Sequence, residues 1–330
     1  MALGEFELIT RFFSNIDGGS DRGETHAIEL GVGDDCALLT PPPNTQLAIS
    51  VDTLVADVHF PAQAHGDDIA QKALRCNLSD LAAMGAEPLA FTLALSLPHA
   101  DADWLAAFSR GLRACADAFR IPLIGGDTTR NPVPTITIQV FGTVPHGSAL
   151  LRSGAQIGDA IYVSGTLGDA RAALDDLALA DTQLSEAQRF QRARYYTATP
   201  RIALGVALRG VASAAIDISD GLAADLGHIL ERSAARAGHA LGAEIDSTRL
   251  PLSGALRAHP QALAFALGGG DDYELCFTVP PQNTPAVARI ATELALPLTE
   301  IGTIVAGGQL LARDSDGRLQ ALEKLGYRHF

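Results

Sequence analysis

Aspartate residues recur beside glycine and at the ends of apolar runs along this sequence. In GVGDDCALL, residues 31–39, two adjacent carboxylates stand between glycines and an apolar run. Glycine and aspartate are typical turn residues, so one interpretation is a simple turn. The other is a ligand site, because loops at strand ends leave backbone amides and side chains free. The recurring set is Asp34, Asp35, Asp52, Asp80, Asp127, Asp217, Asp220, Asp271 and Asp272.

Several converging carboxylates would require cations. Two like charges about 4 Å apart repel by about 4 kcal/mol at an effective dielectric constant of about 20. Aspartate oxygens without histidine or cysteine partners favour Mg²⁺ over zinc, and Mg²⁺ held by carboxylates is typical of phosphate substrates. The sequence has no GxxxxGK[ST] motif, and neither Lys72 nor Lys324 lies in a glycine-rich loop, which excludes a P-loop or protein-kinase-like site. An ATP site would then use metal, backbone amides and Arg152, whose guanidinium suits phosphate.

Spacing places some of these residues on shared faces. Ser50 and Asp52 fall on one face of a strand, because side chains repeat every two residues. Asn77 and Asp80 fall on one helix face at i, i+3. The surroundings of Asp80, CNLSDLAAMGA, are nearly uncharged, and a buried lone carboxylate is costly. We therefore expect Asp80 to meet a cation or a donor rather than solvent.

Two further motifs combine aspartate with glycine. In IDISDG, Asp217 and Ser219 share a strand face, and Asp220 is expected to begin the next helix, where an N-cap role is compatible with metal binding. In GGDTT, residues 125–129, two glycines before Asp127 let a backbone approach a ligand closely.

The composition of the chain limits the classes of function that it can have. The chain has 330 residues, a net charge of −14 and 47% hydrophobic residues, enough for two domains with large cores. The sequence has no cluster of Lys and Arg residues, so a nucleic acid is not expected as a partner. The start carries no basic leader and the apolar runs are too short for a bilayer, so we expect a cytoplasmic protein without membrane contact. The four cysteines form no CxxC pair and are expected to be small buried hydrophobes.

The elements that position these residues mix helices and strands in both halves. A Gly/Ser-rich segment, PHGSALLRSGAQIGD, predicts a boundary between domains 1–148 and 149–330. Residues 121–128 are expected to form a short buried strand that ends in a Gly-Gly-Asp turn. Helices are expected at 4–13, 66–84, 101–119, from 168, at 197–210, 220–238 and 282–295, and other strands at 37–39, 46–55, 89–97, 135–144, 160–165, 213–219, 241–246, 272–279 and on to 313.

Ordered motifs run along nearly the whole chain: GEFELI (4–9), GVGDDCALL (31–39), LAISVDTLVADVHF (47–60), KALRCNLSDLAAMGAEP (72–88), LIGGDTTR (123–130), RSGAQIGDAIYVSG (152–165), AIDISDGLAADLGHI (215–229), GGGDDYELCFTV (268–279) and GYRHF (326–330). Together they resemble the thiamine-monophosphate kinase family, within the aminoimidazole ribonucleotide synthetase-like superfamily. The resemblance implies a mixed α+β and α/β fold of two domains. It implies an N-terminal domain that binds ATP and metal, dimerises and contributes strands to a barrel shared across a homodimer, and a C-terminal α/β domain.

The resemblance also implies an activity, the transfer of the γ-phosphoryl group of ATP to thiamine monophosphate, and it assigns residues. Its catalytic residues fall on Asp35, Asp80 and Asp127. Metal positions fall on Asp35, Ser50, Val51 (through its backbone), Asp52, Asp80, Asp127, Asp217 and Asp220. ATP contacts fall on Gly126, Asp127, Arg152 and Ser219, and substrate contacts on His59, Asp271 and Tyr327.

This sequence departs from the family pattern at two of these positions. Val51 stands where threonine is frequent, and a backbone ligand tolerates that change. Asp271 stands where glutamate is usual, one methylene shorter. Two other positions have ordinary alternatives: His59 as a loop histidine, and Tyr327 as a residue that packs the C-terminal tail.

The expected mechanism is direct in-line transfer without a covalent enzyme intermediate. The acceptor phosphate is already ionised, so charge repulsion is the barrier, and several Mg²⁺ ions would neutralise it; K⁺ is a further candidate cofactor. Two alternatives remain. One is another ATP-dependent synthetase of the superfamily, acting on formylglycinamidine ribonucleotide or selenide. The other is a non-catalytic protein that binds nucleotide or thiamine phosphate.

Overall fold

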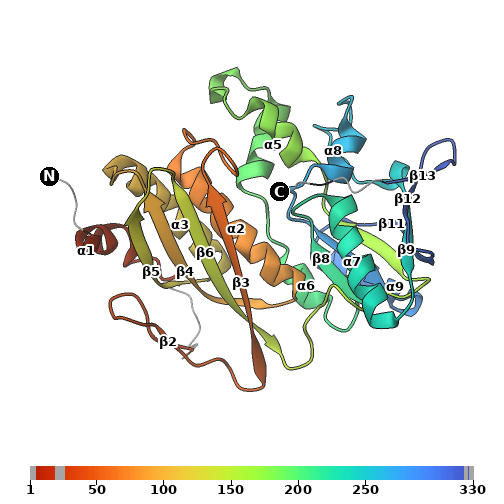
Figure 1. Ribbon diagram of the computed structural model, residues 1–330, viewed down its shortest axis with the longest axis horizontal. Helices are drawn as coiled ribbons and strands as arrows, with labels where there is room; N and C mark the ends of the chain where they lie inside the picture. The colour runs from red at the N-terminus through yellow and green to blue at the C-terminus, as the bar shows by residue number, and fades with distance from the viewer. Residues whose placement is uncertain (1–4, 19–26, 323–325, 327–330) are drawn as a thin grey trace. The chain divides into compact units, whose positions relative to one another are not determined.

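The computed structural model describes residues 5–18, 27–322 and 326 (Figure 1). The chain divides into two compact units, each with its own sheet. Unit 1 comprises residues 1–81 and 86–147, and unit 2 comprises residues 82–85 and 148–330.

Unit 1 is built on a four-stranded sheet in the order β3-β6-β4-β5. β3, β6 and β4 pair antiparallel, whereas β5 runs parallel to β4. Helices α2 and α3 cover one face of this sheet (Figure 1). The bounds are β3 Thr45–Val55, β4 Glu87–Leu97, β5 Leu123–Arg130, β6 Thr135–Pro145, α2 Gly66–Ala83, α3 Ala102–Phe119, α1 Glu5–Leu8, a π-helical turn Ile9–Phe13, β1 Ile28–Leu30 and β2 Leu38–Leu39.

The helices of unit 1 form where the apolar spacing and caps predict them. Asp101 caps α3, since its side chain accepts from the backbone N–H groups of Asp103 and Trp104. Leu112 of α3 and Leu78 of α2 are fully buried, as are Phe91 and Ile138 of the sheet. The apolar face of each helix therefore supplies the core of unit 1.

β5 differs from the expectation for residues 121–128. The strand does not end in a Gly-Gly-Asp turn but continues through Gly125, Gly126 and Asp127 to Arg130. A Cβ at Gly126 would lie 1.9 Å from the carbonyl oxygen of Leu93 on β4. The glycine is thus needed for the close approach of two strands rather than for a turn.

Unit 2 is built on a seven-stranded sheet in the order β13-β12-β9-β11-β7-β10-β8. Its pairs are antiparallel except β12 with β9. The bounds are β7 Ala160–Ser164, β8 Ala214–Asp217, β9 Leu241–Asp246, β10 Leu275–Val279, β11 Leu298–Ala306, β12 Leu310–Arg313, β13 Leu319–Ala321, α4 Asp169–Ala173, α5 Glu186–Tyr196, α6 Ile202–Ala207, α7 Leu222–Ala237, α8 Ala262–Gly268 and α9 Thr284–Glu293.

Alternation along the strands divides the core of unit 2. Cys276 packs in a cluster with Leu226 of α7, whereas its neighbour Phe277 packs in a second cluster with Leu204 of α6 and Ile290 of α9. The two faces of the sheet are therefore covered by different helices, as the period of two requires.

Several helices of unit 2 depart from the expectations. The helix expected from 168 is the short α4, and neither α5 nor α8 is among the expected helices. A capping box between Ser185 and Gln188 starts α5. α6 covers only Ile202–Ala207 of the expected 197–210. Among the described residues, no helix is long and apolar enough to cross a membrane.

Candidate functional site

In unit 1, β3 and α2 bring two pairs of predicted residues into contact. The hydroxyl of Ser50 donates to Oδ2 of Asp80 at 2.5 Å. The backbone N–H of Asp52 donates to Oδ1 of Asn77 at 3.2 Å. The face of β3 that carries Ser50 thus meets the face of α2 that carries Asn77 and Asp80, a contact that the spacing within each element does not predict.

Asp52 and Asp80 form a pair of nearby carboxylates. Burial, and then the charge of Asp80, raise the pKa of Asp52 to about 7. A carboxylate pair that raises its own pKa in this way suits a divalent cation, which would relieve both burial and repulsion. Within the described residues, no three His, Cys, Asp or Glu side chains cluster closely enough to hold a metal ion.

A second group of predicted residues lines a cleft in unit 1. The cleft has a volume of about 550 Å³ and brings the loop of Asp34 and Asp35 together with Gly126 and Asp127 of β5. Oδ1 of Asp34 accepts from the backbone N–H of Asp35 at 2.9 Å, so Asp34 shapes the turn. The cleft is also lined by Thr128, whose buried hydroxyl has no hydrogen-bond partner among the described residues.

The remaining predicted residues of unit 1 lie on or next to β3. Nδ1 of His59 accepts from the backbone N–H of Val55 at 3.0 Å, so the neutral imidazole carries its proton on Nε2. The side chain of Val51 is 56% exposed, on the strand face opposite Ser50 and Asp52. Tyr327 lies outside the described residues.

In unit 2, the loop after β8 lies against the glycine-rich loop before β10. The backbone N–H of Asp271 donates to the carbonyl of Ser219, and that of Tyr273 to Ile218, both at 2.8 Å. A Cβ at Gly270 would lie 2.5 Å from the carbonyl oxygen of Ser219, so this approach requires glycine. The fold thereby brings Ser219, predicted to contact ATP, next to Asp271, predicted to contact the substrate.

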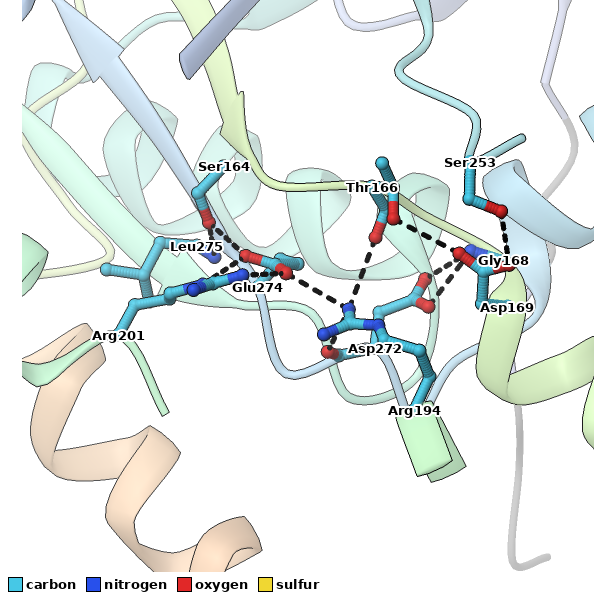
Figure 2. A network of polar contacts seen from close by, with 10 residues as sticks. All are labelled: Ser164, Thr166, Gly168, Asp169, Arg194, Arg201, Ser253, Asp272, Glu274 and Leu275. Atoms are coloured by element: carbon cyan, nitrogen blue, oxygen red, sulfur yellow. Dashed lines mark hydrogen bonds and ion pairs between the residues drawn. The ribbon is translucent and has the colours of Figure 1, made fainter. Parts of the chain in front are cut away.

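Buried ion pairs anchor the end of the glycine-rich loop, where it enters β10 (Figure 2). Glu274 is fully buried and accepts from Arg201 at 2.6 Å through both of its oxygens, from Arg194 at 3.0 Å and from the hydroxyl of Ser164 at 2.5 Å. Arg194 also donates to the carbonyl of Asp272 at 3.3 Å. α5 and the start of α6 therefore clamp the end of the loop.

The conformation of this loop is costly for its residues. Asp271 and Tyr273 adopt φ values of 58° and 50°, in the left-handed region that non-glycine residues rarely populate. Between them, the buried carboxylate of Asp272 accepts from the backbone N–H of Gly168, and burial raises the pKa of Asp272 well above its ordinary range. The hydroxyl of Tyr273 donates to Oδ1 of Asp271 at 3.0 Å. The anchors thus hold a strained loop that sets the position of the Asp271 carboxylate.

The loop after β8 has its own anchor, which corrects the expectation for Asp220. α7 begins at Leu222 with Gly221 as its N-cap residue, so Asp220 does not begin the helix. The N–H groups there are instead satisfied by the side chain of Asp225. Burial, and then the charge of Asp220, raise the pKa of Asp225 to about 7, while the backbone donors and Arg152 lower it.

Several of these anchoring residues have no role that the sequence predicts. Glu274 lies inside a recognised motif, yet nothing in that motif identifies its two arginine partners, 80 and 73 residues away in the sequence. Asp225 could have been found, because an aspartate in the first turn of a helix after Asp-Gly is a typical acceptor for free N–H groups. Arg152 is exposed, on the loop before β7 in the same unit.

Comparisons with known proteins cover the whole chain. The family described as AIR synthase related protein, N-terminal domain, matches residues 33–144. The thiamine-monophosphate kinase of Escherichia coli K12 is 47% identical over 337 residues, covering 100% of this chain and 99% of that protein.

Solved structures of similar proteins share the fold. The crystal structure of thiamine-monophosphate kinase from Stenotrophomonas maltophilia K279a has a TM-score of 0.82 and 47% identity, covering 90% of this chain and 93% of that one. AaThiL complexed with AMPPCP and TMP has a TM-score of 0.77 and 29% identity, covering 88% and 89%. The mixed α/β fold expected from the sequence is confirmed by these structures.

Proposed function

We propose that this chain, which belongs to the thiamine-monophosphate kinase family, phosphorylates thiamine monophosphate with ATP to give thiamine diphosphate and ADP. This is the last step of thiamine diphosphate biosynthesis. The observation that carries the proposal is the full-length identity of 47% to an enzyme with this activity in its name. The similar AaThiL structure holds AMPPCP and TMP, one compound for each of the two reactants.

The chemistry of the reaction asks the protein for positioning rather than for a strong base. The acceptor is a phosphate oxygen that is ionised at neutral pH. A bond forms between this oxygen and the γ-phosphorus while the bond from the γ-phosphorus to the β–γ bridging oxygen breaks, and ADP leaves with the electron pair. The residues of the chain must therefore hold two anions in line against their repulsion.

Carboxylates in each unit are proposed to hold Mg²⁺, which supplies charge neutralisation and alignment of the phosphates when bound. The raised pKa of Asp52 beside the charge of Asp80 and the cleft that Asp35 and Asp127 line support this assignment. The proposed metal-holding residues are Asp35, Ser50, Val51 through its carbonyl, Asp52, Asp80, Asp127, Asp217 and Asp220, among which Asp35, Asp80 and Asp127 are the proposed catalytic residues. K⁺ as a further ion stays a prediction.

Polar groups of the chain are proposed to bind the two reactants. The exposed guanidinium of Arg152 and the hydroxyl of Ser219 would contact ATP, together with Gly126 and Asp127. The Nε2–H of His59, the carboxylate of Asp271 and Tyr327 would contact thiamine monophosphate. The Tyr273 hydroxyl donates to Oδ1 of Asp271 and fixes the orientation of this shorter side chain.

A homodimer is proposed from one exposed face of β3. Leu47, Ile49 and Val51 alternate along the strand and are 43%, 54% and 56% exposed. Three apolar side chains in a row on an outer sheet face are typical of an interaction surface. A barrel that β3 shares with its copy in a second subunit would cover them. The cytoplasmic location expected from the sequence stays a prediction.

The direct test incubates purified protein with ATP, Mg²⁺ and thiamine monophosphate, and separates the products by chromatography. We expect thiamine diphosphate in a one-to-one ratio with ADP, and only when Mg²⁺ is present. Absence of product from protein that binds Mg-ATP in calorimetry would overturn the proposal. It would favour another acceptor of the superfamily, or a protein that only binds these phosphates.

A further inference from the structure

Helix α7 carries two buried polar side chains on one face. Asp225 and Ser233 are 2% and 1% exposed and lie eight positions apart. Residues at i, i+4 and i+8 share a helix face, so both side chains point the same way from one rigid element. Each of them binds the backbone of a different loop.

Asp225 holds the loop after β8 through a single oxygen. Its Oδ2 accepts from three consecutive backbone N–H groups, those of Ser219 and Asp220 at 3.1 Å and that of Gly221 at 3.0 Å. Consecutive N–H groups that converge on one point form a concavity suited to an anion. Here the anion is the protein's own carboxylate, so the shape of the loop depends on α7.

Ser233 holds the loop before β7 in a comparable way. Its Oγ accepts from the N–H groups of Gly154 and Ala155 at 3.1 Å, and donates to the carbonyl of Arg152 at 3.4 Å. A hydroxyl has one donor and two acceptor sites, so all the hydrogen-bonding sites of the Ser233 hydroxyl are used by this loop. A Cβ at Gly154 would lie 2.3 Å from the carbonyl oxygen of Ser213, so the path of this loop requires glycine.

We infer that Asp225 and Ser233 are positioning residues that fix, on one helix, the two loops that grip the nucleotide. The inference rests on the proposed function, in which Arg152 and Ser219 contact ATP. Neither Asp225 nor Ser233 needs to touch a reactant. Together they bind six backbone groups, and the eight-residue spacing on α7 sets the distance between the two loops.

The first experiment measures the binding of Mg-AMPPCP and of thiamine monophosphate by calorimetry, with thermal melts as a check on folding. Asp225→Ala and Ser233→Ala should each weaken nucleotide binding about tenfold, because a loop loses its anchor. Asp225→Asn keeps an oxygen that can accept all three N–H bonds, so its affinity should stay within about threefold of wild type. Thiamine monophosphate binding should change by less than about twofold in Ser233→Ala, because Ser233 binds only the loop before β7.

A matched control is Ser247→Ala. Ser247 is also buried in unit 2, and its hydroxyl donates to the carbonyl of Arg313, away from both loops. The control should leave nucleotide binding unchanged. Equal losses in Ser247→Ala and Ser233→Ala, or equal losses in Asp225→Asn and Asp225→Ala with the folds intact, would overturn the inference.

The second experiment links each anchor to its loop by double-mutant cycles. Arg152→Ala should weaken nucleotide binding in the wild-type background but by less than about twofold in Ser233→Ala; Ser219→Ala should behave likewise with Asp225→Ala. Additive losses would reject the positioning role while leaving the proposed function in place. No loss from Arg152→Ala and Ser219→Ala in wild type would instead reject their ATP roles. If Asp225→Ala does not fold, the cycle of Ser233→Ala with Arg152→Ala is sufficient to test the positioning role.

Discussion

At the scale of single residues, the Asp52–Asp80 pair shows a carboxylate that opposes folding. The pKa of Asp52 is about 7 in the folded chain, against 3.8 for an ordinary aspartate. Between these pH values the folded protein holds more protons than the unfolded chain, so metal-free stability falls as the pH rises from 3.8 to about 7. A group kept at such a cost is typical of a functional site.

Asp52→Asn should therefore stabilise the metal-free protein. At pH 8 in EDTA we expect its Tm to exceed that of wild type by a few degrees, and the difference should shrink toward pH 5. Mg²⁺ should raise the Tm of wild type more than that of the variant, because a ligand that binds only the folded state stabilises it. Differential scanning calorimetry measures both effects; a lower Tm for the variant in EDTA at pH 8 would contradict the expectation.

Asp127 and Asp34 line the same cleft but have different expected roles. Asp127→Asn should lower kcat by about 100-fold or more with little change in Tm, because a proposed ligand of the Mg²⁺ that neutralises the phosphates is lost. Asp34→Asn is the matched control: its amide oxygen can still accept from Asp35, so kcat should stay close to wild type. Near-normal turnover by Asp127→Asn, in an assay for thiamine diphosphate, would remove Asp127 from the catalytic set.

At this scale the sequence predicts only local relations. The spacing of Asn77 and Asp80 predicts one helix face, and the alternation of Ser50 and Asp52 predicts one strand face. The hydrogen bonds between the two elements come from the structure alone. Partners far apart in the sequence, such as Glu274 and Arg201, have no local signature. The site roles taken from the family resemblance stay predictions.

At the scale of elements, α5 and α6 act as a clamp on the glycine-rich loop. Their arginines neutralise a fully buried Glu274, and removal of one member of a buried ion pair is far more damaging than loss of an exposed pair. The same elements were the least predictable: α5 is polar in sequence, and its role follows only from contacts across unit 2.

Glu274→Gln should destabilise the protein by about 3–5 kcal/mol, because two buried guanidinium groups lose their counter-charge. Arg249→Ala provides a comparison within the same unit, since its 3.4 Å pair with Glu300 has both side chains largely exposed. Arg249→Ala should lower the free energy of unfolding by about 1 kcal/mol or less. Urea unfolding measures both values, and equal values would show that the clamp contributes no more than a surface pair.

At the scale of the whole molecule, exposed apolar side chains on β3 carry the proposed dimer. Ile49→Asp should shift the protein from dimer to monomer in analytical ultracentrifugation, because a charge would be buried against the apolar face of the second subunit. Leu263→Asp on α8 is the control, as Leu263 is 46% exposed in the other unit and should leave the mass unchanged. A wild-type protein that sediments as a monomer would refute the dimer.

The broad fold was within reach of the sequence. Alternating apolar runs predict most strands, and a capping residue predicts the start of α3. The mixed α/β fold is confirmed by solved relatives. The course of β5 was not predictable in the same way, because Gly-Gly-Asp reads as a turn unless the close approach of β4 is known. Strand order is likewise a property of contacts distant in the sequence.

The place of β8 at the end of its sheet has a consequence for protein synthesis. β8 pairs with β10, which follows it in the chain only after β9, α7 and α8. The backbone that fixes Ile218 and Ser219 comes from residues 271–274, so the loop cannot take its final shape on a nascent chain that ends earlier. At ordinary rates of translation this delay is on the order of 10 s. A growing chain would therefore gain the final shape of the loop that is proposed to contact ATP only after most of unit 2 has left the ribosome.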